Sequence, residues 1–161
     1  MKQPSEFSEE VVQINRVSKK TQGGNKIGFS AIVVVGNKKG KVGLGLGKAA
    51  DVVSSIRKAS AYAKRHLVDV PLKNGTIPFE IKIKKGAAQI LLRPAPRGSG
   101  IIAGGAVRSV VSAAGIENIS SKILGSGNKA SNVYATIFAL QKISALNDRS
   151  RQRVKIRKVW K

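Results

Sequence analysis

The chain contains no cysteine, one histidine, and only 8 acidic residues against 30 basic ones. Without cysteine there is no disulfide, thiolate nucleophile or zinc finger, and the composition suits a reducing compartment. The single histidine, His66, allows no catalytic triad or histidine metal site, and we expect it on the surface at a helix C-terminus. The acidic residues after position 10 are isolated in sequence, so no carboxylate dyad is indicated. We therefore expect no enzymatic activity, no metal site, no cofactor and no small-molecule substrate.

Long apolar runs are also missing. The longest stretches without a charged residue, 27–37 and 130–141, fall well short of the roughly 20 residues that span a bilayer. No stretch combines a basic face with a bulky apolar face, as an interfacial helix would. The first residues include three Glu and no apolar segment, which argues against a secretory signal or a transit peptide. The sequence predicts a soluble protein without a membrane partner.

The excess of Lys and Arg gives a net charge of +22 and a pI of about 11.0. Such self-repulsion is tolerable when counterions or a partner's phosphates neutralise it, so nucleic acid is the first partner to consider. Apolar residues make up 42% of the chain, enough for a folded core. Aromatic residues make up only 4% and form no clustered pair that could stack on unpaired bases. We expect contacts to phosphates and to RNA shape to dominate.

The first part of the chain has the pattern of three strands and a helix. We expect strands at 11–20, 29–35 and 41–47, a Lys-bearing glycine loop at 21–28, a turn at 36–40 and a helix at 49–67. The third strand alternates Val42, Leu44 and Leu46 with glycines, which leaves bare backbone on one face. A packed helix or strand and an RNA backbone are equally good candidates to cover that face. In the helix, an apolar stripe that includes Val53 is expected to point inward, and the basic side that includes Arg57 is either solvated or an RNA contact.

A break at 70–75 separates this unit from a second one. We expect a strand at 77–83, its partner at 87–93, a helix at 104–114, a weaker strand within 116–124 and a final helix after 125–128. The predicted fold class is α+β, with a β-β-β-α unit followed by a β-β-α-β-α unit that shares an interface with it. The predicted divisions are an acidic tail at 1–10, domains at 11–70 and 71–147, and a basic tail at 148–161. We expect the basic tail to order only on its anion, with Trp160 docked on the body.

Two glycine-containing segments resemble nucleotide-binding motifs, but neither satisfies the motif. The segment around 41–49 lacks the first glycine and the final hydroxyl of a phosphate loop, having Val42 and Ala49 there. The string of Gly98, Gly100 and Ala103 follows a proline-containing loop in a unit that opens as a hairpin, which does not fit a dinucleotide site. What remains are two places where glycines precede a helix and offer backbone N–H groups to an anion, at Gly47 with Lys48 and at Gly104 with Gly105.

Several ordered blocks resemble the bacterial-type small-subunit ribosomal protein five family. They are NRVSK at 15–19, GKVGLGLGKA at 40–49, NGT at 74–76, RPAPRGSGIIAGGAVR at 93–108, and GSGN at 125–128 followed by NVYAT. The resemblance runs from about Val11 to Leu146. It implies a domain similar to the double-stranded-RNA-binding fold, followed by a C-terminal domain typical of this family. It further implies a non-enzymatic constituent of the small ribosomal subunit, in the cytoplasm or in an organelle, which binds rRNA, stabilises the head relative to the body and supports translational accuracy.

The contact residues are predicted from charge and loop placement together with this resemblance. The predicted rRNA-binding residues are Arg16, Lys19, Lys20, Gly23, Gly24, Asn25, Lys26, Lys48, Arg57, Arg97, Arg151 and Arg153. The resemblance places ribosomal protein four beside the region 100–108, with Gly100, Gly104, Gly105 and Arg108 as the predicted protein interface, and ribosomal protein eight near the C-terminal domain. The alternative is a free-standing double-stranded RNA-binding or RNA-chaperone protein.

Overall fold

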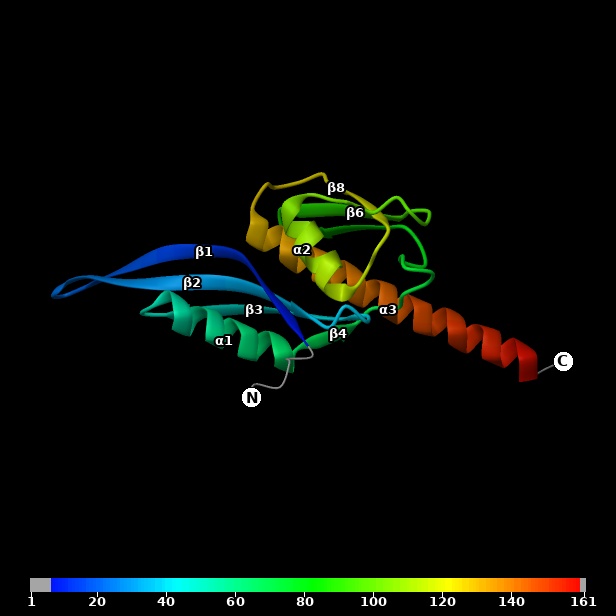
Figure 1. Ribbon diagram of the computed structural model, residues 1–161, viewed down its shortest axis with the longest axis horizontal. Helices are drawn as coiled ribbons and strands as arrows, with labels where there is room; N and C mark the ends of the chain where they lie inside the picture. The colour runs from blue at the N-terminus through cyan, green and yellow to red at the C-terminus, as the bar shows by residue number, and fades with distance from the viewer. Residues whose placement is uncertain (1–6, 160–161) are drawn as a thin grey trace.

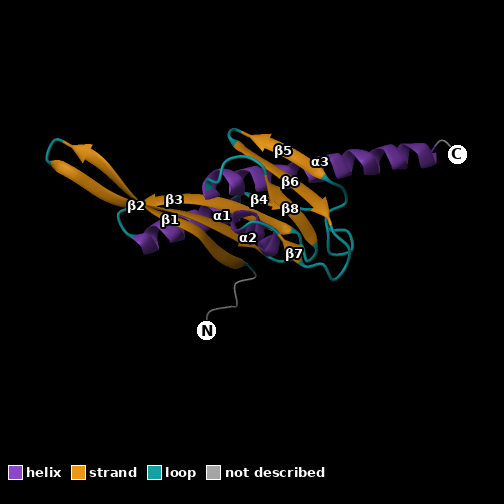
Figure 2. Cartoon of the chain, turned by 90° about the horizontal axis from the view of Figure 1, so that it is seen from above, coloured by secondary structure: helices purple, strands orange, loops and turns teal. Residues whose placement is uncertain are grey.

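The computed structural model describes the backbone of residues 7–159 and the side chains of residues 7–149. The chain forms two four-stranded sheets, one with the strand order β1-β2-β3-β4 and the other β5-β6-β8-β7. The elements, shown in Figures 1 and 2, are β1 (Ser8–Thr21), β2 (Gly24–Gly36), β3 (Lys41–Ala49), α1 (Val52–Arg65), β4 (Leu67–Asp69), β5 (Ile81–Lys85), β6 (Ala88–Pro94), β7 (Ile101–Ile102), α2 (Gly105–Ala114), β8 (Ile119–Ile123) and α3 (Lys129–Val159). The predicted α+β class is confirmed.

The first sheet is an antiparallel meander. Its strand β1 begins at Ser8, so residues 8–10 belong to the sheet and not to a separate acidic tail. The Oε1 atom of Glu9 lies 2.7 Å from Lys64 Nζ on α1, and Glu10 accepts a hydrogen bond from Ser109 on α2. The short strand β4, which the sequence did not predict, follows α1 and pairs with β3.

Helix α1 covers the bare face of β3. A Cβ atom added to any of the three alternating glycines of β3 would collide with a backbone carbonyl oxygen of α1; these glycines are Gly43, Gly45 and Gly47. Because the helix lies so close, the residues that it turns inward are small, as are Ser55, Ala59 and Ala63. The larger Val53, predicted to point inward, is 65% exposed. Of the two candidates for covering the glycine face, the packed helix is the one observed.

The second unit differs from its prediction in two places. Strand β5 begins at Ile81, four residues later than expected, since Pro78 cannot donate a ladder hydrogen bond. The two-residue strand β7 precedes α2 and pairs in parallel with β8, which the pattern of the sequence did not indicate. Helix α2 matches its prediction within one residue and ends at Gly115, whose left-handed φ of 85° closes the helix.

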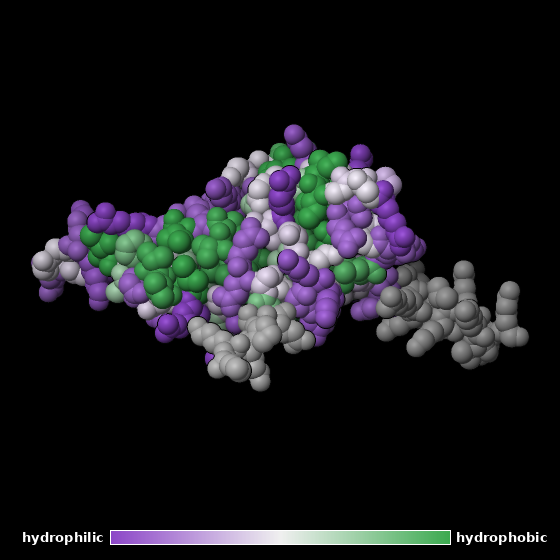
Figure 3. Space-filling view, viewed as in Figure 1, coloured by the Kyte–Doolittle hydropathy of each residue, from purple (hydrophilic) through white to green (hydrophobic). Residues whose placement is uncertain are grey.

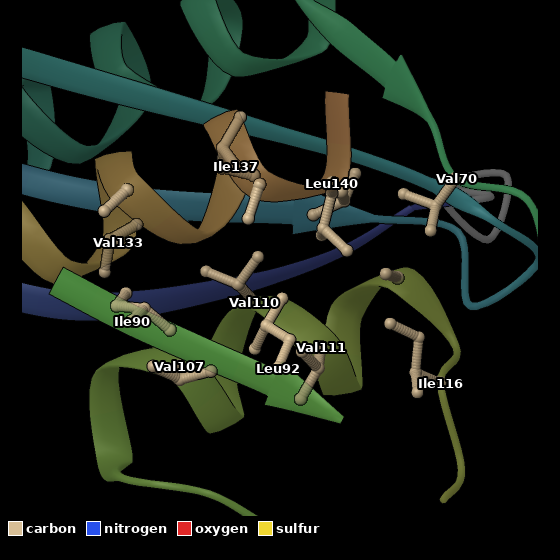
Figure 4. Packing of buried hydrophobic residues seen from close by; sticks show 14 of the residues in the cluster. Val70, Ile90, Leu92, Val107, Val110, Val111, Ile116, Val133, Ile137 and Leu140 are labelled. Carbon is tan, nitrogen blue, oxygen red and sulfur yellow. The ribbon is translucent and has the colours of Figure 1, made fainter. Parts of the chain in front are cut away.

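The two units share one core. Helices α2 and α3 lie between the sheets, so the layers run α1, first sheet, α2 with α3, second sheet (Figure 1). Val110 and Leu140, from the two helices, and Leu92 from the second sheet are fully buried in one cluster with Val34 of the first sheet. Figure 4 shows the α2, α3 and β6 side chains of this cluster pointing toward one another. A domain boundary near residue 70 stays a prediction, because buried contacts continue across it.

Helix α3 is longer than predicted. It has 31 residues, and its backbone continues through the basic segment that we expected to order only on its anion; that expectation stays a prediction. Extending an existing helix avoids the cost of nucleating a new one, which explains how the basic segment becomes helical. The predicted docking of Trp160 lies outside the described residues. Within the described part of the chain, no helix is both long enough and apolar enough to cross a membrane.

Candidate nucleic-acid interface

The main candidate is the outer part of the β1–β2 hairpin, which extends beyond α1 and the second sheet (Figures 1 and 2). Only Gln22 and Gly23 lie between the two strands, so most of the predicted loop at 21–28 is β-strand. Thr21 Oγ1 donates a 2.8 Å hydrogen bond to the carbonyl oxygen of Gly24, whose φ of 127° requires glycine. Hydrophilic side chains gather around this end of the molecule (Figure 3).

Strand register places three predicted lysines on one face. Lys19 is paired with Lys26 across the hairpin, and Lys48 is paired with Ser30, which shares a face with Lys26. The three lysines line a single open hollow of about 480 Å³, and no carboxylate lines it. Its other lining residues are Val17, Ser18, Ile27, Gly28, Phe29, Ala49 and Ala50. Like charges that face each other across a strand pair repel, so this face favours an anion between the lysines.

The remaining predicted residues of the hairpin lie on its other face or at its tip. Arg16 is paired with Phe29 and Lys20 with Asn25, which places Arg16, Lys20 and Asn25 on the side that carries α1. Gly23 has open space around its Cα atom. The predicted basic group is therefore divided into two surfaces, and the structure does not bring all of its members together.

The exposed side of α1 is less basic than its sequence suggests. Lys64 forms an ion pair with Glu9, and Ser60 Oγ donates a 2.7 Å hydrogen bond to the same carboxylate. The Lys64 ammonium and the Ser60 hydroxyl hold the pKa of Glu9 below its ordinary value. The exposed Arg57 lines the hollow beside this pair. A phosphate at Arg57 would therefore lie near a carboxylate as well.

One predicted anion position is occupied by the protein itself. Gly47 and Lys48 lie within β3 and not at the start of a helix, which corrects that prediction. The N-cap of α1 is Asp51, whose Oδ2 accepts a 2.9 Å hydrogen bond from the Ser54 backbone N–H. That hydrogen bond lowers the pKa of Asp51, so a carboxylate already occupies the helix N-terminus.

The loop before α2 is held by a residue that the sequence did not single out. Asn118 is buried, and its Oδ1 accepts hydrogen bonds from the backbone N–H groups of Gly98 at 3.0 Å and Gly100 at 3.1 Å. The predicted contact Arg97 lies in this loop and shares its hollow with Glu117, so its surroundings include a carboxylate. No local motif indicates Asn118, because its partners lie about 20 residues earlier in the chain.

Of the predicted protein interface, Gly104, Gly105 and Arg108 are exposed at the start of α2, and Gly100 is half-buried in the loop before it. Gly104 is the N-cap of α2 and caps it without a side-chain hydrogen bond, and Gly105 has open space around it. Arg108 is exposed, and its Nη2 donates to the carbonyl oxygen of Ile101 at 3.4 Å. The neighbouring Ile102 is 57% exposed. This surface is formed by the loop, β7 and the first turn of α2. It therefore combines glycine backbone with the apolar side chain of Ile102 and the cation of Arg108.

The described residues offer no catalytic alternative. His66 Nδ1 lies 3.0 Å from the carbonyl oxygen of Tyr62, and the two rings stack with centroids 4.1 Å apart. Among the side chains described, no group of three acidic or histidine residues is placed to hold a metal ion. The predicted contacts Arg151 and Arg153 lie on the last turns of α3, where the backbone alone is described.

Comparison with known proteins identifies the class. The model of the ribosomal protein S5 N-terminal domain matches residues 7–71, and that of the C-terminal domain matches residues 83–153. These two matches, in this order, define a structural and non-enzymatic constituent of the small ribosomal subunit. The chain belongs to the ribosomal protein S5 family.

Individual relatives are similar to this chain over most of their length. The small ribosomal subunit protein uS5 of Thermotoga petrophila is 51% identical over 141 residues, which is 88% of this chain and 79% of the relative. The uS5 of Chloroflexus aurantiacus is 49% identical over 92% of this chain and 83% of its own. A relative named uS5c, from Cyanophora paradoxa, is 46% identical over 92% of this chain and 88% of its own.

Proposed function

We propose that the chain binds small-subunit rRNA in the ribosome, and that the hairpin face with Lys19, Lys26 and Lys48 makes the principal phosphate contacts. The observation that carries this is the convergence of three lysines on one hollow whose lining has no carboxylate. Phosphate oxygens between the lysines would offset their mutual repulsion and release condensed counterions from the RNA. Arg16, Lys20 and Arg57 then supply weaker contacts from the α1 side.

A charge-removal experiment tests this proposal. We expect the triple variant Lys19→Gln, Lys26→Gln, Lys48→Gln to weaken binding to a small-subunit rRNA transcript. The slope of log affinity against log salt should become shallower by about 2, since each lost phosphate contact removes roughly 0.7–0.9 from the slope. Binding is measured by titration at several salt concentrations, with circular dichroism to confirm the fold.

The matched control removes the same charge elsewhere. Lys39, Lys73 and Lys142 are exposed and lie outside the hairpin, so their replacement by Gln should leave the slope close to that of the unmodified chain. Equal slopes for the two triple variants would show that only net charge matters, and an unchanged slope for the hairpin variant would remove these lysines from the interface.

We further propose that the chain stabilises the head of the subunit relative to its body and supports translational accuracy. The hairpin and the end of α3 extend from the body in opposite directions (Figure 1), a shape suited to contacts at separated points. The surface that includes Gly100, Gly104, Gly105 and Arg108 is proposed to contact ribosomal protein four, and the C-terminal unit ribosomal protein eight. Sucrose-gradient sedimentation tests incorporation: salt-resistant comigration with the small subunit supports a fixed constituent, and its absence supports a free-standing RNA-binding protein.

A substitution tests the contact with protein four. Arg108→Glu reverses an exposed charge whose one described hydrogen bond is long, so the fold should persist. Cross-linking to protein four should fall, and a stop-codon readthrough reporter should change, while sedimentation with the subunit is retained. Unchanged cross-linking and readthrough would exclude this surface.

A further inference from the structure

We propose that the outer face of the second sheet is a further phosphate-binding surface for rRNA, formed by Lys82, Lys84 and Lys122. This inference rests on the proposed function, in that rRNA is the partner. It adds a surface on the C-terminal unit, separate from the hairpin, with lysines that are not among the contacts predicted from the sequence.

The second sheet is covered by helices on one face only. Helices α2 and α3 pack on the inner face, where Ile81, Ile83 and Leu92 are buried in the common cluster. Because side chains alternate along a strand, Lys82 and Lys84 of β5 point to the outer face. Within the described part of the chain, no helix lies over that face (Figure 1). It is therefore open to a large partner.

Strand register arranges the three lysines around one central residue. Lys82 is paired with Leu91 on β6, and Leu91 is paired with Lys122 on β8, so the three side chains form a row across the sheet. Two strand spacings place the lysines of this row about 10 Å apart, and Lys84 follows about 7 Å along β5. All three lysines are exposed, and Leu91 between them is half-buried. The cations are thus spread over a broad surface, as successive phosphates are.

The charge of this face is not compensated by the protein. Among the described strand residues that the register places on it, none is acidic. Glu80, which lies just before β5, accepts a 2.6 Å hydrogen bond from Arg93 Nε and is already paired. None of the ion pairs between described side chains includes a lysine of the proposed surface. The face is therefore complementary to a polyanion.

The composition of the face favours the RNA backbone over bases or a protein. Protein interfaces are depleted of lysine, especially at their centre, whereas here two lysines flank the central Leu91. No side chain on this face of the described strands is aromatic, so unpaired bases have nothing to stack on. Contacts to phosphates position an RNA without reading its sequence.

The new surface and the hairpin surface lie on the same side of the first sheet. Lys48 shares a strand face with Leu44, which is buried against the layer of α2 and α3. The second sheet lies beyond that layer, with its outer face directed away from α1 (Figure 1). A folded RNA can contact both surfaces without passing around α1.

Charge-removal variants of the full chain test the proposed surface. We expect the triple variant Lys82→Gln, Lys84→Gln, Lys122→Gln to make the log–log salt dependence of binding to a small-subunit rRNA transcript shallower by about 2. The fold should be kept, as circular dichroism can check, because all three side chains are exposed. Replacing the same lysines by Arg retains the charge and should retain the slope. A slope equal to that of the control triple variant defined above would overturn the proposal.

A positional probe tests the same surface independently of affinity. The chain has no cysteine, so Ser120→Cys places a single thiol on the outer face, beside Arg93. An iron–EDTA group tethered to this thiol should cleave the bound transcript, and cleavage should fall when the three lysines are replaced by Gln in the same chain. Absence of cleavage would overturn the proposal. Cross-linking of this thiol to a neighbouring protein in the assembled subunit, without RNA cleavage, would assign the face to a protein partner instead.

The same measurements separate this proposal from that of the hairpin. If the Lys19, Lys26 and Lys48 variant changes the slope and the sheet-face variant does not, the sheet-face proposal fails and the hairpin proposal stands. The reverse result rejects the hairpin alone, and no change in either rejects both. If both surfaces bind at once, combining the six substitutions should make the slope shallower by about 4.

Discussion

Gly45 lies under α1, where the helix and β3 are too close for any side chain. A Cβ atom there would collide with the carbonyl oxygen of Ala59, and backbone cannot yield as a flexible side chain can. We therefore expect Gly45→Ala to lower the free energy of unfolding by about 3 kcal/mol, through separation of the helix from the strand. Urea denaturation followed by circular dichroism measures this.

Gly23→Ala is the matched control. Gly23 has nothing within 4 Å of an added Cβ and lies at the tip of the hairpin, so the change should be within about 0.5 kcal/mol. Equal stabilities for the two variants would mean that α1 is not packed tightly on the glycine strand.

Residue type alone identified the basic candidates, but not the faces on which they lie. The register of β1 against β2 shifts between Val11 and Gln13, which is typical of a β-bulge. It changes the faces of residues 8–11 relative to the rest of β1, whereas the two-residue turn at Gln22 and Gly23 places Lys19 and not Lys20 opposite Lys26. Alternation along a strand predicts which of its residues share a face. A bulge depends on the partner strand, so the sequence of one strand carries no local signal for it.

At the scale of elements, the strongly periodic segments were predictable and the short ones were not. Helix α2 and strand β6 have clear periodicity and flanking glycines, and both lie close to their predicted positions. The strands β4 and β7 have three and two residues and exist because a neighbouring strand offers free hydrogen-bonding groups. The glycine-containing segment at 21–28 was expected to be a loop, but pairing with β1 extends it as strand.

The loop before α2 depends on one buried amide. Asn118→Ala would leave the N–H groups of Gly98 and Gly100 without their acceptor, so we expect a loss of about 1–3 kcal/mol in stability. Asn118→Asp keeps the acceptor oxygen and should lose less. Urea denaturation compares the variants, and hydrogen exchange of the loop reports where the change occurs.

We expect Asn118→Ala to change amide hydrogen exchange only in residues 95–102. Equal protection of the loop in both variants would show that other contacts hold it. The result also bears on the proposed contact with ribosomal protein four, since Gly100 belongs to that surface.

At the scale of the whole molecule, the sequence predicted two units and their order, and it predicted an interface between them. It did not predict that α2 and α3 would both lie between the sheets, because long-range layer order is not expressed in local periodicity. The result is one buried cluster with members from β2, β3, β5, β6 and both helices. Such a core fixes the first sheet, which carries the hairpin, relative to the second sheet.

A shared core predicts cooperative unfolding of both sheets. Val110 on α2 is fully buried in the common cluster, so Val110→Ala should destabilise the chain by roughly 2 kcal/mol. Because the first and second sheets both pack on this layer, amide protection should fall together in β2 and β6 when hydrogen exchange is measured at low denaturant. Val53→Ala, at a position 65% exposed, is the control and should change protection in neither. Loss of protection in β6 alone would show that the two units unfold independently and that the predicted boundary near residue 70 separates two thermodynamic domains.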